Sequence, residues 1–516
     1  MRHATTQRPR PRRRQRQQFA VILSVSVLAL LASACGSRLG GSQAALAQGS
    51  GSGGRAGGGA GSGVTGGTGA GDTTTTVATA SASGGTAGTA GTAGTAGHAG
   101  GPSTAAATGG AAGAAAAGTS PAAPCGANGN IAPAGGNGGA TGPGVTATTI
   151  TVGNIASISG VAPGLTQSAQ QATEAWAAYV NSTGGLCGRQ IKVQPFDDGN
   201  DSGTNYADAQ QACSADFAMV GNASGFDDGS AQAVGACGIP TMAAEVSTAA
   251  AGNTADIFGA SPGNAHYWSL GPANYLKTTY PNAVTKAAMI YLNVSATQTQ
   301  AAHETASYTG DGFHYVYNTS TTPTNANYAA NVQAMQSAGA QYVTEYSDAS
   351  SAERLLQAMQ QANYAPQVVD WFSEEYSPQF AQQTAPESNG DLVLMSATAA
   401  YSEANVNPGL QLMESWMNRV APGYHQDIFA MLAWSAGLAF EQALKEVGPD
   451  VTRAAVISKL QGLTSWTGGG VTPPVNIGQK IPSKCFFYVK IENGAFDRVY
   501  PTAPNTYDCN SGYAQY

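Results

Sequence analysis

The sequence predicts an α/β protein whose folded part, residues 145–516, forms two lobes, each built on a mainly parallel sheet. Short apolar runs alternate there with helical stretches of about 10–15 residues, which is the pattern of βαβ units. A break near residues 257–272 divides the alternation into two series, each large enough for its own sheet. The composition of residues 36–144 adds a disordered linker in front.

The first 35 residues have the features of an export signal. Residues 1–18 contain seven arginines and no acidic residue, and the apolar stretch 19–34 follows. A basic start, a short apolar run and small residues before a cleavage point are typical of a secretory signal peptide. Ala32-Ser33-Ala34-Cys35 resembles the lipobox of bacterial lipoproteins, with Ala32 where Leu is usual, and this resemblance implies lipidation of Cys35. Ordinary cleavage beside an incidental cysteine is the alternative, and the export route stays open.

Residues 36–144 are predicted to be a disordered linker. Gly, Ala, Ser and Thr predominate, with four tandem Thr-Ala-Gly units at 86–97. Such a composition cannot bury enough apolar surface to offset the entropy of the chain. At roughly 5–6 Å × √n for a Gly-rich coil, about 110 residues span some 55–60 Å, enough to hold a domain away from a membrane.

Charge divides the chain at the same place. Before residue 145 there are nine basic residues and one acidic residue, Asp72, whereas residues 145–516 have 13 basic and 29 acidic residues, a net charge of −16. Because nucleic acid is bound through a positive field, this balance excludes nucleic acid as a partner.

The cysteines beyond Cys35 predict disulfides rather than a metal site. An even number of cysteines in an exported chain favours disulfides, with fifteen possible connectivities for six. Their spacing favours two local loops and leaves a third pair near the start of the body; the pairs are Cys213 with Cys237, Cys485 with Cys509, and Cys125 with Cys187. There is no C-x-x-C and the histidines are scattered, so neither a metal nor a cofactor is expected.

The first series of elements begins with a buried strand at 150–155. The helix at 168–180 follows, with Ala172, Trp176 and Val180 on one side. The remaining elements of this series are a strand at 191–196, a helix at 206–216 and strands at 217–220 and 239–243.

The second series resumes after the break. Its strands are expected at 287–292, 314–317, 341–345, 367–372 and 391–395, and its helices at 296–307, 328–338, 350–362 and 377–382. Further helices are expected at 409–420, 428–447 and 452–461. The chain then ends in a hairpin of 485–491 and 495–499, with Asn493-Gly494 in the turn.

Three stretches of the body carry a family resemblance. The first comprises 150–160, 181–191 and Asp197-Asp198. The second is 212–240, which contains Cys213 and Cys237, and the third is 354–362 together with the following 366–369. Together they resemble the leucine/isoleucine/valine-binding family of type I periplasmic binding proteins, substrate receptors of ABC importers, over about 148–500. The resemblance implies a Cys213–Cys237 disulfide and two Rossmann-like lobes that are joined by three crossovers and close on a ligand in a cleft. Lobe 1 would comprise about 145–270 and 400–470, and lobe 2 about 271–399 and 471–516.

The resemblance also implies that loops after the strands hold the ligand. The candidates in those loops are Ser157, Ser159, Ser224, Asp227, Glu245, Ser247 and Thr248 in the first lobe, and Ser295, Tyr346 and Glu374 in the second. Hydroxyls and loop N–H groups of the first lobe can hold a carboxylate, and a carboxylate of the second lobe can accept from an ammonium group. Asp227 departs from the Ser/Thr-rich loop usual in the family and would repel a ligand carboxylate, so an amide, a polyamine or another small solute stays open beside an amino acid.

The function implied is that of an extracytoplasmic receptor of an ABC importer. It would capture a small polar solute (a branched-chain amino acid, an amide or similar) as a monomer beside its permease, attached to the outer face of the cell membrane by a lipid anchor only. The alternative is a surface-anchored ligand sensor or interaction protein without a transporter. An enzyme is not expected, because the G-x-S-x-G match at Gly259–Gly263 places Pro262 where an oxyanion hole needs a backbone N–H.

Overall fold

The computed structural model describes residues 125–263 and 266–515. The predictions for the signal peptide, for lipidation of Cys35 and for the linker up to residue 124 concern residues outside these ranges. Among the described residues, none of the helices combines the length and the hydropathy that a membrane crossing requires.

The first sheet of the described chain is parallel throughout and has the strand order β2-β1-β3-β4-β5. Its strands are β1 (Thr149–Ala156), β2 (Gln190–Asp197), β3 (Ala218–Val220), β4 (Thr241–Glu245) and β5 (Ile257–Ser261). The helices of this lobe are α1 (Gln167–Ser182), α2 (Ser202–Ala215), α3 (Asp228–Cys237), α4 (Ala249–Asn253), α10 (Pro408–Val420), α11 (Ile428–Val447) and α12 (Arg453–Gln461).

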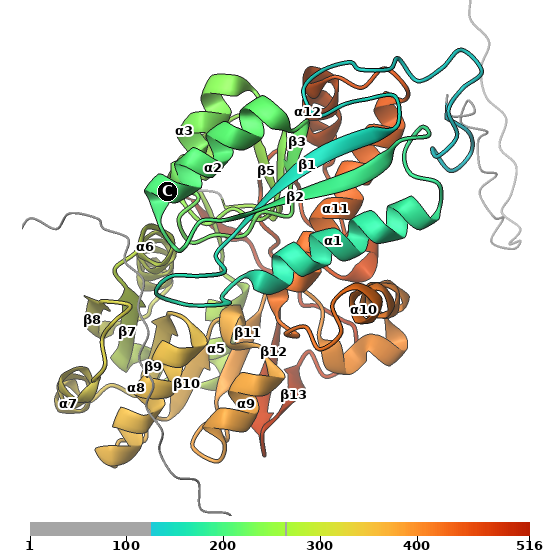
Figure 1. Cartoon of the computed structure of the whole chain (residues 1–516). Helices are drawn as coiled ribbons and strands as arrows, with labels where there is room; N and C mark the ends of the chain where they lie inside the picture. The colour runs from blue at the N-terminus through green and yellow to red at the C-terminus, as the bar shows by residue number, and fades with distance from the viewer. Residues whose placement is uncertain (1–124, 264–265, 516) are drawn as a thin grey trace, which may run out of the picture. The chain divides into compact units, whose positions relative to one another are not determined.

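Helix α11 is the central helix of the first lobe. It packs against β3, β4, β5 and α1 (Figure 1), and 15 of its 20 residues are buried. Asp427 caps its start by accepting from the Ala430 N–H at 3.1 Å, and Gly448 follows its end. A Cβ atom at Gly437 would overlap the Trp176 ring of α1, so glycine allows the two helices to approach closely. Helices α2 and α3 pack against each other. Their buried residues form a second hydrophobic cluster with Phe196, Met219 and Ile239.

The second sheet has the order β13-β12-β11-β10-β9-β7-β8 in the described residues. Its strands are β7 (Ala287–Leu292), β8 (Tyr315–Thr321), β9 (Tyr342–Tyr346), β10 (Val368–Trp371), β11 (Leu392–Met395), β12 (Phe487–Glu492) and β13 (Ala495–Tyr500). Strands β12 and β13 are antiparallel additions, as the predicted hairpin requires, and the other pairs are parallel. The helices of this lobe are α5 (Gly271–Thr279), α6 (Ser295–Gly310), α7 (Ala329–Ala338), α8 (Ala349–Gln361) and α9 (Pro378–Thr384).

The chain crosses between the two sheets three times in the described residues. It passes to the second sheet after β5, returns after β11, and passes back before β12. Two short strands, β6 (Tyr267–Ser269) and β14 (Tyr513–Gln515), pair beside these crossovers. The α/β class with two mainly parallel sheets is confirmed.

The folded part begins earlier than the predicted boundary at residue 145. Residues 125–144, assigned to the linker on composition, pack on the first lobe. Cys125 is fully buried and bonded to Cys187, and the Asn137 side chain donates to Ala147 O at 2.9 Å and to Cys187 O at 3.0 Å. This segment has no apolar period because it is held by a disulfide and by polar contacts, so its composition resembles that of residues 36–124.

Elements absent from the sequence prediction are short or rich in small residues. Strand β5 lies within the segment 257–272 that was expected to be a transition, and it ends just before Pro262-Gly263. Helix α3 contains Gly229 and Gly235, which lower intrinsic helix propensity, and α5 begins with Gly271-Pro272. Each forms because the sheet beside it supplies packing that local propensity does not reveal.

Candidate functional site

Two adjoining cavities lie between the lobes, where strands of both sheets end. The cleft cavity has a volume of about 80 Å³. Its walls follow β1, β3 and β4 in the first lobe and β7, β9 and β10 in the second; they include Thr166, Ser224, Phe226, Ser247, Thr297, Asp348 and Glu374. The carboxyl ends of parallel strands are the usual place for a ligand in such sheets.

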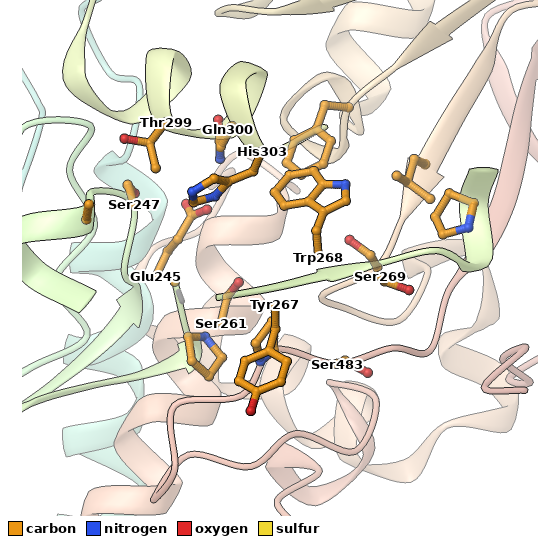
Figure 2. A pocket seen from close by; sticks show the side chains of 18 of the residues that line it. Glu245, Ser247, Ser261, Tyr267, Trp268, Ser269, Thr299, Gln300, His303 and Ser483 are labelled. Atoms are coloured by element: carbon orange, nitrogen blue, oxygen red, sulfur yellow. The ribbon is translucent and has the colours of Figure 1, made fainter. Parts of the chain in front are cut away.

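The hinge cavity lies next to the crossovers and has a volume of about 130 Å³. Crossover segments form much of its wall, namely 261–263, 267–269 and 482–483. Figure 2 shows Glu245, Gln300 and His303 converging at one end, with the Trp268 indole beside His303; the two ring centroids are 6.0 Å apart. The two cavities share Glu245, Ser247 and Gln300 as lining residues, so they meet at one polar wall.

Two carboxylates from different lobes lie near each other here, Glu245 in the shared wall and Glu374 in the wall of the cleft cavity. Glu245 ends β4, and burial, aided by the nearby Asp227 carboxylate, raises its pKa to about 7. Glu374 lies in the 3-10 turn Ser373–Glu375 after β10, and burial, with the charge of Glu245 adding to it, raises its pKa well above the usual value. Glu374 Oε2 is shielded from solvent and has no hydrogen-bond partner among the described residues. A bound cation would relieve the cost of holding these two carboxylates in a dry site.

Asp227 lies behind Glu245 and organises the loop that follows β4. Its carboxylate accepts from the backbone N–H groups of Ser247 at 2.8 Å and Thr248 at 3.0 Å. Burial raises the pKa of Asp227 to about 7, although these hydrogen bonds oppose the shift. The Thr248 hydroxyl then accepts from the Ala251 N–H at 3.3 Å and caps α4.

Asp198 organises the loops after β1 and β3. It accepts from Ser157 Oγ at 2.8 Å and from Asn205 Nδ2 at 2.9 Å, and also from Ser224 Oγ. The sequence places Asp198 at the end of a strand, but nothing in it shows that two predicted ligand-binding serines would be held by this buried carboxylate.

The structure brings half of the ten predicted ligand-binding residues to the two cavities. Those that line them are Ser224, Glu245, Ser247, Thr248 and Glu374. Asp227 lines a smaller space behind Glu245. The other four do not line either cavity; they are Ser157, Ser159, Ser295 and Tyr346.

The reasons for these four placements are local. Ser157 is fully buried beside Asp198, whereas Ser159 is exposed and its N–H donates to Asp197 Oδ1 at 3.0 Å. Ser295 is the first residue of α6. Tyr346 ends β9 with its side chain inside the second lobe, where it donates to Glu304 Oε2 at 2.5 Å.

Several lining residues were missed because their positions carry no sequence signal. Gln300 and His303 lie inside α6, beyond the loop after β7, and Tyr267 and Trp268 belong to a crossover. Phe372 follows β10 and packs on Tyr346 with ring centroids 4.9 Å apart.

The buried Glu304 in α6 predicts that stability falls as pH rises. Burial raises its pKa from 4.5 to about 7, against the opposing hydrogen bonds from Tyr346 and Tyr315. Because the folded-state pKa is the higher one, the stabilisation is complete below about pH 4.5 and is lost as pH rises through about 7. Between pH 5 and pH 8 the unaltered protein should lose about 2 kcal/mol more of its free energy of unfolding than the Glu304→Gln variant does. Urea unfolding of both proteins at both pH values measures this difference. An unchanged pH dependence in the variant would show that Glu304 is ionised in the folded protein.

Comparisons with known proteins agree with this architecture. A family model described as periplasmic binding protein matches residues 149–495. A search of curated proteins found no match.

Solved structures of similar fold include three solute-binding proteins. A fatty acid ABC transporter substrate-binding protein from Thermomonospora curvata has a TM-score of 0.60 and 17% identity, covering 73% of this chain and 94% of its own. A branched-chain amino acid transporter substrate-binding protein from Streptococcus pneumoniae, in complex with isoleucine, has a TM-score of 0.58 and 14% identity, with coverages of 69% and 100%. A solute-binding protein of an ABC transporter from R. palustris, in complex with benzoate, has a TM-score of 0.57 and 15% identity, with coverages of 70% and 98%. At these identities the likeness establishes the fold, and the three solutes differ in chemistry.

Proposed function

This chain belongs to the periplasmic binding protein family, and from that membership we propose that it is the extracytoplasmic receptor of an ABC importer and captures a small solute between its lobes. The observation that carries the proposal is the polar wall shared by the two cavities, where Glu245 of one lobe lies close enough to Glu374 of the other for their charges to interact. A receptor of this kind is a binding protein and not an enzyme. A branched-chain amino acid, an amide or a similar molecule has a polar head that this wall could hold.

The solute would favour closure because each lobe supplies part of its contacts. A ligand shifts an equilibrium between open and closed forms only by binding one of them more tightly. A polar head between Glu245 and Glu374 contacts both lobes at once, which is possible only when the lobes approach each other. The remainder of the solute would occupy the hinge cavity, which residues of both lobes also line.

The partners follow from the same proposal. A permease in the membrane would receive the solute from the closed receptor, and structural neighbours named as ABC transporter components support this assignment. Lipidation of Cys35 and the linker after it would keep the receptor, a monomer, at the outer face of the membrane.

The proposal is tested by thermal unfolding of the purified chain with a panel of amino acids, amides, amines and carboxylic acids. A solute that binds only the folded state adds about 2.7 kcal/mol of stability at a hundredfold excess over Kd. We therefore expect one chemical class to raise Tm by several degrees while the others leave it unchanged. A flat Tm across the whole panel at millimolar concentrations would refute the receptor function.

A further inference from the structure

The backbone donors that follow β4 are already engaged by the protein. The two oxygens of Asp227 accept one N–H each, from Ser247 and from Thr248. A solute carboxylate held by this loop would need the same two donors, because a backbone N–H has a single hydrogen to offer. Asp227 therefore takes the place that a solute carboxylate would occupy.

Four of the five hydroxyl groups that line the cleft cavity, all except that of Ser247, are engaged as well. Each hydroxyl has one hydrogen, and four of them donate it within the protein: Thr166 to Ala223 O (2.8 Å), Thr297 to Leu292 O (2.5 Å), Ser347 to Asp348 O (3.2 Å), and Ser224 to Asp198. A solute carboxylate could recruit any of them only by breaking an internal bond.

The charges around the two cavities favour a cation. Glu245, Asp348 and Glu374 are among the described residues that line the cavities, and none of those lining residues is Lys or Arg. His303 also lines the hinge cavity, but burial lowers its pKa and so favours the neutral imidazole. A carboxylate moved into such a site would lose its water without gaining the positive charge of a Lys or Arg, which is strongly unfavourable. An ammonium group can donate three hydrogen bonds to carboxylates there.

One part of the wall of the hinge cavity is apolar. Trp268, Tyr308, Phe372 and Leu394 line it, and the Trp268 indole lies beside His303. This wall suits a branched or aromatic hydrocarbon group, which gains free energy on leaving water.

From these contacts, and resting on the receptor function proposed above, we infer that the solute is a small organic amine without a carboxylate group. Its ammonium group lies between Glu245 and Glu374, and its apolar arm fills the hinge cavity.

The test compares three molecules with the same branched skeleton by isothermal titration calorimetry. Isoamylamine has the amine alone, leucine has both the amine and the carboxylate, and isocaproate has the carboxylate alone. Because placing like charges together in a binding site is unfavourable, we expect isoamylamine to bind at least about tenfold more tightly than leucine, and isocaproate to bind most weakly. Phenethylamine, phenylalanine and hydrocinnamate repeat the comparison with an aromatic arm.

Asp227→Ala probes the reason for this preference. The substitution frees the N–H groups of Ser247 and Thr248 and removes a negative charge that repels a carboxylate and attracts an ammonium group, so the affinity for leucine relative to isoamylamine should rise at least about tenfold. Asp227→Asn serves if the alanine variant does not fold, since it removes the charge and keeps one acceptor. Asp201→Ala is the matched control, because Asp201 is an exposed carboxylate that caps α2 by accepting from the Thr204 N–H at 2.8 Å, outside both cavities.

The outcomes separate this inference from the receptor function. Leucine binding to the unaltered protein at least as tightly as isoamylamine, or no rise in the affinity for leucine relative to isoamylamine in either Asp227 variant, would overturn the inference and leave the receptor function standing. If neither these two series nor the broader panel binds, the receptor function itself fails.

Discussion

Glutamine in place of Glu374 should weaken the binding of isoamylamine by about 3–4 kcal/mol, several hundredfold in Kd, because it removes one member of a desolvated charge pair. The same substitution should stabilise the unliganded protein, since the charge of Glu245 no longer opposes a second carboxylate and a glutamine amide can donate to it. Titration calorimetry and thermal unfolding without solute measure the two effects separately.

A lower affinity for the amine together with a higher stability of the unliganded protein would indicate that the two carboxylates are kept for binding. Glu387→Gln is the control, because Glu387 is an exposed glutamate of the same lobe that accepts from Gln360 Nε2 at 2.7 Å. It should alter neither affinity nor Tm by much. An affinity for amines that is unchanged in Glu374→Gln would remove Glu374 from the site.

Methionine in place of Arg189 should destabilise the folded protein by about 4 kcal/mol, because it leaves several carbonyl groups without a donor. Arg189 is fully buried and donates to Thr146 O at 2.8 Å, to Pro449 O at 3.0 Å and to Gly139 O at 3.0 Å, and also to Asn137 O. These carbonyls belong to the segment before β1 and to the connection between α11 and α12. One guanidinium group thus joins parts of the chain that the sequence separates by some 300 residues.

Urea unfolding would measure this loss. Arg419→Met is the matched control, since Arg419 is exposed on α10, with its guanidinium 4.6 Å from the Trp416 ring centroid, and should lose less than about 1 kcal/mol. Equal losses in the two variants would show that the carbonyl contacts of Arg189 do not stabilise the fold.

The fold was predictable wherever one segment carries its own hydrophobic pattern. Strand β1 and helix α11 were placed within one residue because each combines length with a clear apolar pattern. Helix α3 and the segment 125–144 could not be predicted in this way. Segments that contain glycine and little apolar patterning look like a linker in the sequence, and the segment 125–144 is held in place by a disulfide to Cys187 and by Arg189, two residues that lie apart from it in the sequence.

The site was predictable only to the level of loops. Strand order puts Glu245, Ser247 and Glu374 at the carboxyl ends of strands, and the structure brings all three to the cavities. The direction of a side chain at a strand end is decided by packing, so Tyr346 lies inside its lobe with Glu304 instead. Gln300 lines both cavities from within helix α6, and a prediction limited to the loops after strands does not reach a residue inside a helix.

The crossovers that wall the hinge cavity are also the segments that must bend when such lobes close. A solute arm bound among Ser261, Trp268 and Ser483 would keep these crossover segments apart and so limit how far the lobes can close. Arms of different bulk would then hold the lobes at different angles, and a permease that recognises one angle would distinguish solutes without touching them.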